Sequence, residues 1–466
     1  MPDSPPPYPG IKSRRAVLKS LGRAAAAGLL ASHATAAEEH ARRRRPPNVV
    51  LIVADDLGYG EVSCYPQTKP IRTPNIDRIA RAGVRLTQGY SADPMCWPSR
   101  GSLLTGRYHE RWRSSARVPN DERMIGRYLR PAGYTTGVIG KWHNTGSIGV
   151  WDGKPENHPH GQGFDEFFGF LGGMHDYFDA DLGTHFKQGR NRPHEMPIYD
   201  GTERVPEVAY LTDEFSDRAV AFIRRHRAEP FFLFLPYTAK HTPLQAPKTY
   251  LDRNDGDVNA AMIDAMDTGV GRVLDTLEAL GLTENTMVWF VGDNGGWPDS
   301  NWPLRGKKGM LFEGGIRVPF LVAWPDGLPR EATCDHPVQH IDVMATIVAA
   351  AGANVPEDRN LDGVNLLPFL RAETDGPPHE VLFWCRHDAS RFAVRRGKWK
   401  LVRDVEARGA PPVTGLFDLE NDAAETRNLL DRHRPVADDL LARYTAWLKA
   451  IGRDVPAIDL PDAAAK

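Results

Sequence analysis

From about residue 47 onward, the sequence alternates short apolar runs rich in β-branched and aromatic residues with longer amphipathic segments. This alternation is typical of an α/β domain, because two parallel strands need a crossover segment, usually a helix, between them. The predicted strands are Asn48–Ala54, Tyr134–Ile139, Phe231–Tyr237, Met287–Val291 and Phe320–Ala323. The predicted helices are Asn75–Ala82, Thr212–Arg227, Val258–Leu280 and Ile341–Ala351. We therefore expect a large mixed, mostly parallel sheet sandwiched by helices.

A different pattern follows Pro377-Pro378, where short alternating apolar segments replace the strand-and-helix units. These segments are Val381–Cys385, Arg391–Val394, Trp399–Arg403 and Leu416–Leu419, with an amphipathic stretch at Val436–Ile451 after them. Short alternating strands indicate an antiparallel sheet with one buried face, which a helix can cover. We predict a main domain over residues 47–376 and a small C-terminal α+β subdomain over residues 377–466.

The region between Trp142 and Val208 is rich in glycine, histidine, proline and aspartate and has weak periodicity. Such composition favours irregular structure, and long loops in α/β domains often shape the substrate site. We expect long loops over one edge of the sheet here.

The N-terminal segment, residues 1–36, has the pattern of an export signal. It contains the twin-arginine sequence Ser13–Lys19, a modestly apolar run at Ala24–Ala31, and the small-x-small sequence Ala34-Thr35-Ala36. Such signals are removed after export; the alternative is a short alanine-rich helix with two incidental arginines. We expect export by the twin-arginine translocase of a bacterium to the periplasm or medium, with residues 37–46 as a basic linker.

Composition excludes some other classes of protein. The chain has 58 Lys and Arg against 60 Asp and Glu, a net charge of -2, which argues against a general nucleic-acid binder. No run of about 20 apolar residues occurs, so we expect no membrane anchor. The four cysteines lack the C-x-x-C spacing of zinc sites and redox pairs, and a bridge between Cys334 and Cys385 stays open.

Four of the predicted strands end in charged or polar residues. These residues are Asp55-Asp56, Lys141 and His143, Lys240 and His241, and Asp293-Asn294. Any one such pair is explained by caps and turns, which favour aspartate and asparagine. Ligands of an open parallel sheet, however, bind beyond the carboxyl ends of its strands, so four pairs together predict a site at this edge.

The acidic part of this set indicates a metal ion. Three carboxylates and one amide oxygen suit Ca²⁺, or less well Mg²⁺, rather than zinc or copper. Without a cation, carboxylates this close together would raise one another's pKa. The lysines and histidines beside them predict an anionic ligand.

The segment from Cys96 to Gly106 reads CWPSRGSLLTG. Pro98 can begin a helix, Leu103 and Leu104 can anchor it, and Gly106 can end it, which places Cys96 at a helix N-terminus, where an anion is favoured. The segment resembles the signature of type I sulfatases, C-x-P-S-R-x-x-L-L-T-G. In that family the cysteine is oxidised to formylglycine by a formylglycine-generating enzyme, and the hydrated aldehyde is the nucleophile. The alternative is a reactive or merely buried thiol.

Other blocks of the chain resemble the same family. They are Asn48–Gly60, Gly140–His143, His241-Thr242-Pro243, Val291–Gly296, Leu304–Pro319 and Leu416–Leu419 with the acidic residues that follow. The resemblance implies one calcium ion held by Asp55, Asp56, Cys96, Asp293 and Asn294. It implies a sulfate pocket completed by Arg100, Lys141, His143, His241 and Lys308. The chain departs from the family at Trp97, which is bulkier than usual, and at Lys307, which leaves open which lysine reaches the sulfate.

The resemblance implies an alkaline-phosphatase-like fold and a calcium-dependent sulfatase that acts on a sulfated carbohydrate or an aryl sulfate. Two alternatives remain open at this stage. One is a phosphonate monoester or phosphodiester hydrolase of the same superfamily, and the other is a catalytically silent protein that binds sulfated glycans through an unmodified Cys96.

Overall fold

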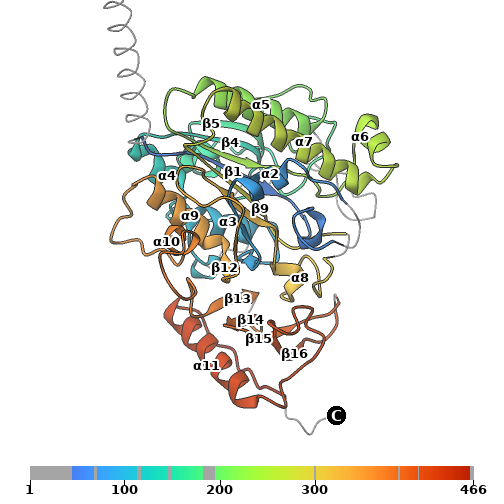
Figure 1. The fold of residues 1–466 in the computed structure, drawn as a ribbon, viewed down its shortest axis with the longest axis vertical. Coiled ribbons are helices and arrows are strands. Elements are labelled where there is room, and N and C mark those ends of the chain that lie inside the picture. The colour runs from blue at the N-terminus through green and yellow to red at the C-terminus, as the bar shows by residue number, and fades with distance from the viewer. Residues whose placement is uncertain are drawn as a thin grey trace, which may run out of the picture. The chain divides into compact units, whose positions relative to one another are not determined.

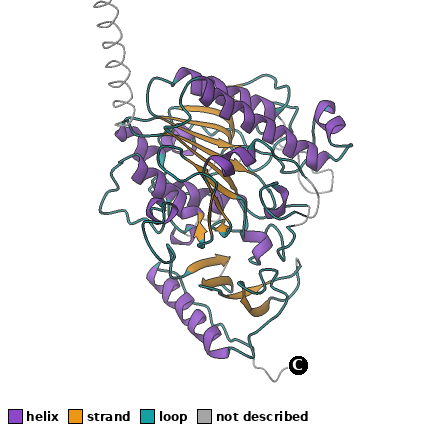
Figure 2. Cartoon of the chain, in the orientation of Figure 1, coloured by secondary structure: helices purple, strands orange, loops and turns teal. Residues whose placement is uncertain are grey.

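A mixed sheet of ten strands runs through the larger part of the described chain, in the order β11-β2-β10-β9-β1-β8-β4-β5-β6-β7. Figures 1 and 2 show this sheet with helices on both sides. Its strands are β1 (Asn48–Ala54), β2 (Val84–Leu86), β4 (Thr135–Lys141), β5 (Glu166–Phe170), β6 (Tyr199–Asp200), β7 (Glu203–Arg204), β8 (Phe231–Pro236), β9 (Thr286–Gly292), β10 (Phe320–Ala323) and β11 (Ala332–Cys334). The five strands from β9 to β5 are parallel, and β10 is antiparallel to β9. The predicted mixed, mostly parallel sheet is confirmed.

The structure is a computed structural model that describes residues 45–67, 71–112, 117–144, 149–181, 195–298, 301–386, 389–407 and 409–461. The predicted signal segment and all but the last two residues of the predicted linker lie outside these ranges. From Pro47 onward the chain forms one compact unit. In the described part, no helix has the length and apolar character needed to cross a membrane, and all four cysteines are free thiols.

Helices cover the sheet on two faces because successive side chains of a strand point in opposite directions. On β1, Val50 and Ile52 belong to one apolar core and Val49 and Leu51 to another. The first core packs under α2 (Ile76–Ala82), α5 (Leu211–Arg225) and α7 (Val258–Ala279), with α6 (Lys248–Arg253) beside α7. The second packs under α3 (Cys96–Thr105), α4 (Gly126–Leu129), α9 (His340–Ala350) and α10 (Leu367–Leu370). Short 3-10 helices lie at Tyr59–Glu61, His109–Arg111, Arg130–Ala132, Pro155–Asn157 and Pro159–Gln162.

One expectation was incomplete. The region expected to form only loops contains β5, a full strand parallel to β4, and the short hairpin of β6 and β7 at the sheet edge. Phe167 and Phe168 of β5 enter the two opposite cores, so this strand is buried on both faces. Gly169 lies directly against Gly140 of β4, where an added Cβ atom would meet the carbonyl oxygen at 1.9 Å. A five-residue run interrupted by glycine is too short to show periodicity.

The chain ends in a separate antiparallel sheet, β13 (Leu382–Arg386), β14 (Arg391–Arg396), β15 (Trp399–Asp404) and β16 (Val413–Asp418). Helix α11 (Arg434–Ala450) packs against β14 and β15, as Figure 1 shows. The remaining elements are β3 (Gly89–Tyr90), its partner β12 (Val338–Gln339) and the short α8 (Glu313–Ile316). The predicted small antiparallel sheet with a helix is therefore present.

Buried charges join the C-terminal subdomain to the start of α8 and to the loop that precedes it. The Nζ atom of Lys400 lies 2.9 Å from a carboxylate oxygen of Glu313 and 2.9 Å from one of Glu425. Asp404 accepts a hydrogen bond from the backbone N–H of Leu311 at 2.5 Å, and Glu425 accepts one from that of Glu313 at 2.6 Å. The loop that carries Lys308 is thus fastened to the C-terminal sheet.

A half-buried histidine gives the protein a pH-dependent component of stability. The Nε2 atom of His379 lies 2.7 Å from Oδ1 of Asp342 in α9. Burial alone would lower the pKa of His379, but the charges of Asp342 and Asp362 and the hydrogen bond raise it above its ordinary value. This interaction therefore stabilises the folded state fully below the ordinary histidine pKa and is lost as the pH rises through the raised pKa. In urea unfolding from about pH 6 to about pH 9, we expect His379→Gln to reduce the decline in stability; an unchanged slope would contradict this assignment.

Candidate active site

The four strands with polar ends are neighbours in the sheet. The order β9-β1-β8-β4 is parallel throughout, so their carboxyl ends lie side by side. Backbone hydrogen bonds continue past the strands: the N–H of Asp55 donates to Ala239 O, that of Lys240 to Asp55 O, and that of Asp293 to Ala54 O, at 2.8 to 2.9 Å. The structure thus brings the predicted polar residues together at one edge.

The acidic residues form a buried cluster. Asp55, Asp56, Asp293 and Asn294 are all fully buried. The Nδ2 atom of Asn294 donates to Asp56 Oδ1 at 2.8 Å, and the backbone N–H of Asp56 donates to Asp293 Oδ1 at 3.2 Å. The Oδ1 atom of Asn294 is buried and has no hydrogen-bond partner. A buried acceptor without a donor is costly, and it is available to a cation.

Cys96 is the first residue of α3, and this helix ends as the sequence predicts. Met95 before it is extended, and Gly106 after it takes a left-handed conformation with its N–H donating to Ser102 O. The Sγ atom of Cys96 lies 3.7 Å from Asp55 Oδ1. Burial raises the pKa of the Cys96 thiol to about 12, so an unmodified thiol stays protonated at neutral pH.

Three cations surround these carboxylates. The Nζ atom of Lys141 lies 2.5 Å from Asp55 Oδ2, and Nε of Arg100 lies 2.9 Å from Asp293 Oδ2. The Nζ atom of Lys308 lies 2.6 Å from Asp56 Oδ1. Lys307 does not enter this cluster, because its ammonium group lies over the Trp297 ring, 4.6 Å from the centroid. Lys308 is therefore the lysine that faces the site.

Both predicted histidines lie at the site. The Nε2 atom of His241 lies 3.7 Å from Asp56 Oδ2, while its Nδ1 atom lies 2.8 Å from Thr242 O. The Nδ1 atom of His143 is buried without a hydrogen-bond partner. Burial lowers the pKa of both imidazoles, and the nearby Lys141 lowers both further. Each imidazole can accept a proton when neutral.

The residues present fit a divalent cation. Asp55, Asp56, Cys96 and His241 each offer one ligand atom, and these four atoms lie within 4.8 Å of one another. The unpartnered Asn294 Oδ1 adds a further oxygen donor at the same edge. His241 was not among the predicted metal ligands. Asp293 was among them, and in this structure it accepts hydrogen bonds from Arg100 and from the backbone N–H of Asp56.

Sequence reasoning missed residues that support the site. Lys240, read as a strand-end group of the anion site, instead lies 3.1 Å from Glu61 and donates to Trp297 O. The Oγ atom of Ser99 lies 2.8 Å from Nδ1 of His340, which begins α9 far along the chain. No local pattern connects these pairs, because each joins segments that are distant in sequence.

Comparisons with known proteins agree with this geometry. The chain matches the sulfatase family over residues 47–353 and the C-terminal family of N-sulphoglucosamine sulphohydrolase over residues 305–449. It is 33% identical to steryl-sulfatase of Mus musculus over 510 residues, covering 85% of this chain and 81% of that protein. It is also 33% identical to N-acetylgalactosamine-6-sulfatase of Homo sapiens over 358 residues, covering 69% of this chain and 65% of that protein.

Solved structures share the fold. Ps i-CgsB, solved in complex with k-i-k-neocarrahexaose, superposes with a TM-score of 0.77 at 34% identity and covers 86% of this chain and 93% of its own. PsFucS1 sulfatase from Pseudoalteromonas sp. superposes with a TM-score of 0.75 at 25% identity over 90% of this chain and 93% of its own. The chain therefore belongs to the sulfatase family of the alkaline phosphatase superfamily and is a sulfuric ester hydrolase.

Proposed function

We propose that this sulfatase hydrolyses sulfate monoesters of a carbohydrate through a formylglycine made from Cys96, with one bound calcium ion. The observation that carries the proposal is the setting of Cys96, buried at the start of α3 beside Asp55. A thiol whose pKa burial raises to about 12 is a poor nucleophile at neutral pH. Oxidation to an aldehyde gives this cysteine a chemical role that the thiol itself could not fill.

The proposed calcium ligands are Asp55, Asp56, Asp293, Asn294 and the modified Cys96. The short distances among the ligand atoms of Asp55, Asp56 and Cys96 and the unpartnered Asn294 oxygen support this assignment. Asp293 joins the set because its Oδ1 atom lies at the same edge, 3.2 Å from the backbone nitrogen of Asp56. Oxygen donors and several carboxylates favour Ca²⁺ over Mg²⁺, which usually keeps several waters of its own. When bound, the cation would withdraw negative charge from the sulfate oxygens.

The cations of the chain bind and orient the sulfate in this proposal. Lys141 and Lys308 lie against the carboxylates of Asp55 and Asp56, where each can donate to a sulfate oxygen. Arg100 is fully buried, and its second terminal nitrogen has no hydrogen-bond partner, so it can support the hydrated aldehyde at position 96. Sulfate ester cleavage, like phosphoryl transfer, gains most from positioning and charge stabilisation.

The two histidines move protons. The Nε2 atom of His241, with Lys308 on the same carboxylate, faces the leaving alcohol and protonates it when the imidazole carries its second proton. His143 then takes a proton from the remaining hydroxyl at position 96, which allows sulfate to leave and the aldehyde to re-form. A serine nucleophile has no such second hydroxyl, and its sulfate ester would be stable.

A sulfated carbohydrate is the proposed substrate class. Two of the similar proteins are an N-acetylgalactosamine-6-sulfatase and Ps i-CgsB bound to k-i-k-neocarrahexaose. The exposed Trp297, 37% accessible and with Lys307 over one side of its ring, offers an aromatic surface against which a sugar can pack. We further propose that the protein is exported to the periplasm or medium by the twin-arginine route after a formylglycine-generating enzyme has acted on Cys96.

The function is tested by parallel assays of 4-nitrophenyl sulfate, defined sulfated oligosaccharides and an aryl phosphonate, with the mass of the tryptic peptide that contains Cys96. We expect formylglycine in the peptide and dominant turnover of sulfate esters. Dominant turnover of the phosphonate would instead indicate a phosphonate monoester hydrolase. The phosphonate monoester hydrolase of Agrobacterium radiobacter shares this fold, with 18% identity and a TM-score of 0.63. A retained thiol without turnover, in protein from its native host, would indicate a glycan-binding protein.

Calcium binding is tested separately from turnover by replacing Asn294 with alanine. This change removes an oxygen that has no hydrogen-bond partner, although it also removes the Nδ2 donor to Asp56. We expect calorimetric titration to show one tight calcium site in the wild type and about tenfold or more weaker binding in Asn294→Ala, the loss of one charge-assisted contact. Asn254→Ala is the matched control, because it removes another asparagine side chain, the C-cap of α6, whose Nδ2 atom donates to Tyr250 O. This variant should bind calcium as the wild type does. Equal calcium affinity of Asn294→Ala and the wild type would remove Asn294 from the ligand set.

A further inference from the structure

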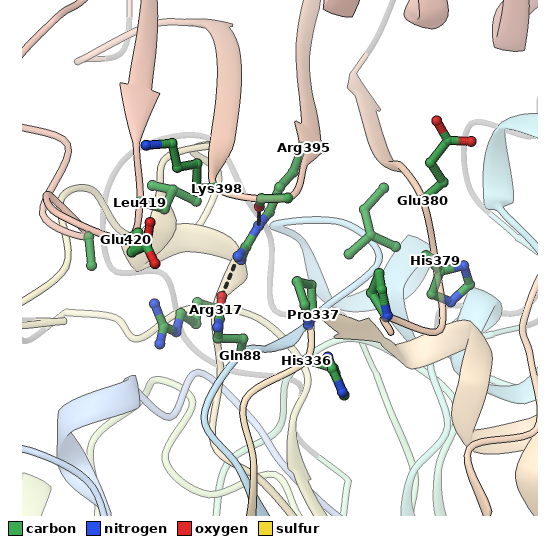
Figure 3. A pocket seen from close by; sticks show the side chains of 14 residues that line it. Gln88, Arg317, His336, Pro337, His379, Glu380, Arg395, Lys398, Leu419 and Glu420 are labelled. Carbon is green, nitrogen blue, oxygen red and sulfur yellow. Dashed lines mark hydrogen bonds between the residues drawn. The ribbon is translucent and has the colours of Figure 1, made fainter. Parts of the chain in front are cut away.

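A second cavity, of about 630 Å³, lies between the C-terminal sheet and the main sheet domain (Figure 3). Its polar and charged lining includes Gln88, Arg317, His336, His379, Arg395 and Lys398. It shares no lining residue with the Cys96 site. Figure 3 shows Arg395 extending from the C-terminal sheet toward Gln88, with Arg317 next to Gln88. A cavity of this volume falls in the range of small-ligand sites.

Arg395 contributes a buried positive charge to this cavity. Its side chain is only 5% exposed, and its guanidinium group donates to Tyr90 Oη, Gln88 Oε1 and Gly397 O. All three acceptors are uncharged. Within the described ranges, no carboxylate pairs directly with the Arg395 guanidinium group within 4.0 Å. Glu313 acts on it at longer range, because Glu313 accepts from the Tyr90 hydroxyl and the Arg395 charge lowers the Glu313 pKa. A buried guanidinium group without a directly paired counter-ion is costly, so a negatively charged partner in contact with it would stabilise it.

The groups behind Arg395 do not supply the missing charge. Glu313 is shared between Lys400, at 2.9 Å, and Arg317, at 3.6 Å. Glu425 also lies 2.9 Å from Lys400, but burial raises its pKa to about 7, so it is only partly ionised at neutral pH. Three cations, including Arg395, therefore face at most two carboxylates. The floor of the cavity carries a net positive charge.

The rim carries charges of both signs. Lys398 is 42% exposed and lies 2.8 Å from Asp418, and His336 and His379 border the opposite side. The rim carboxylates are Glu420 and Glu380, and Glu380 lies 3.1 Å from Arg443. An oxyanion that enters the cavity can contact the Arg395 guanidinium group, which has no directly paired carboxylate.

We propose that this cavity is a second binding site that takes a sulfate or carboxylate group of an acidic polysaccharide, away from the site where the ester is cleaved. The oxyanion faces Arg395 and Arg317, and the sugar unit that carries it occupies the remaining volume. The choice of a polysaccharide as the source rests on the proposed function, whereas the anion site rests on the cavity alone. Free inorganic sulfate has the same chemistry and is the other source that the test distinguishes.

The test measures binding of a heparin-derived hexasaccharide and, separately, of inorganic sulfate, by calorimetric titration. The full chain carries Cys96→Ala so that the hexasaccharide is not cleaved during titration. In this background we compare Arg395→Gln, Lys398→Glu and the control Lys248→Ala, an 84% exposed lysine of α6. We expect Arg395→Gln and Lys398→Glu to weaken hexasaccharide binding about tenfold, the effect of losing one charged contact, and Lys248→Ala to leave it unchanged.

The result that overturns the proposal is hexasaccharide affinity unchanged in Lys398→Glu and in Arg395→Gln. Lys398 lies on the exposed rim, so we expect Lys398→Glu to fold. The affinity of this variant for the hexasaccharide tests the proposal if Arg395→Gln does not fold. Inorganic sulfate could instead bind as tightly as the hexasaccharide and lose its affinity in the same two variants. That result would identify free sulfate, rather than a polysaccharide, as the ligand of this cavity. Turnover of 4-nitrophenyl sulfate by the same variants with Cys96 restored should stay at the wild-type rate. A wild type without turnover, together with weakened binding in the variants, would refute the proposed function and leave this site standing.

Discussion

Replacing Cys96 with alanine is expected to lower the turnover of sulfate esters by at least about a thousandfold, as removal of a catalytic nucleophile does in other enzymes. The reason is specific to position 96. Its side chain lies at the start of α3 against Asp55, and no other cysteine of the described residues belongs to the cluster of Asp55, Asp56, Cys96 and His241. The initial rate of 4-nitrophenyl sulfate hydrolysis, measured on fully matured protein, checks the prediction.

Two controls separate chemistry from folding. The unfolding temperature of Cys96→Ala should stay close to that of the wild type, because the Sγ atom makes one weak contact, at 3.7 Å, with Asp55. Cys334→Ala, a free and buried thiol at the end of β11, should keep full turnover. Wild-type turnover in Cys96→Ala would show that the nucleophile lies elsewhere.

The largest stability effect is expected at Lys400 of β15. Replacing it with methionine leaves Glu313 and Glu425 buried without the ammonium group that lies 2.9 Å from each. Removing one member of a buried ion pair costs about 3–5 kcal/mol, because the remaining charge is left uncompensated. The free energy of unfolding from guanidinium titration at neutral pH measures the loss.

Glu425→Gln is the matched control for this cluster. Because burial already raises the Glu425 pKa to about 7, a neutral amide at this position resembles the form that the folded protein partly populates. Its oxygen can still accept the N–H of Glu313. We expect a loss of less than about 1 kcal/mol, the ordinary net value of one hydrogen bond. Equal losses in Lys400→Met and Glu425→Gln would mean that packing, rather than charge, dominates here.

Local sequence patterns predicted the sheet core and the strand-end residues of the site for one shared reason, whereas the roles of Cys96, Arg100 and Lys308 came from the family resemblance. A buried parallel strand is a continuous apolar run, and its end is marked by the first polar residues, so Asn48–Ala54 and the following Asp55 are recognisable together. The predicted Asn48–Ala54 and Phe320–Ala323 coincide with β1 and β10. Strand β5 was missed because its phenylalanines surround a glycine that fits only against Gly140.

The partners of side chains could not be predicted in the same way. Lys240 follows its strand as Asp55 does, yet it turns to Glu61, because that carboxylate reaches it from another segment. The second cavity is formed by residues as far apart in sequence as Gln88 and Lys398. The periodicity of apolar residues predicts which face of a helix or strand is buried. It does not predict which side chain from a distant segment lies against a given residue.

The fastening of the Lys308 loop to the small sheet has a consequence for how this protein can be divided. Asp404 holds the backbone of that loop at Leu311 and Glu425 holds the start of α8 at Glu313, although both lie beyond the boundary at residue 376. A fragment that stops at this boundary would keep every residue that we assign to sulfate or calcium binding. It would lose the hydrogen bonds that anchor the loop of one of these residues, Lys308. The C-terminal ninety or so residues are thus a component of the active enzyme, and engineered chimaeras should exchange them together with the segment before α8.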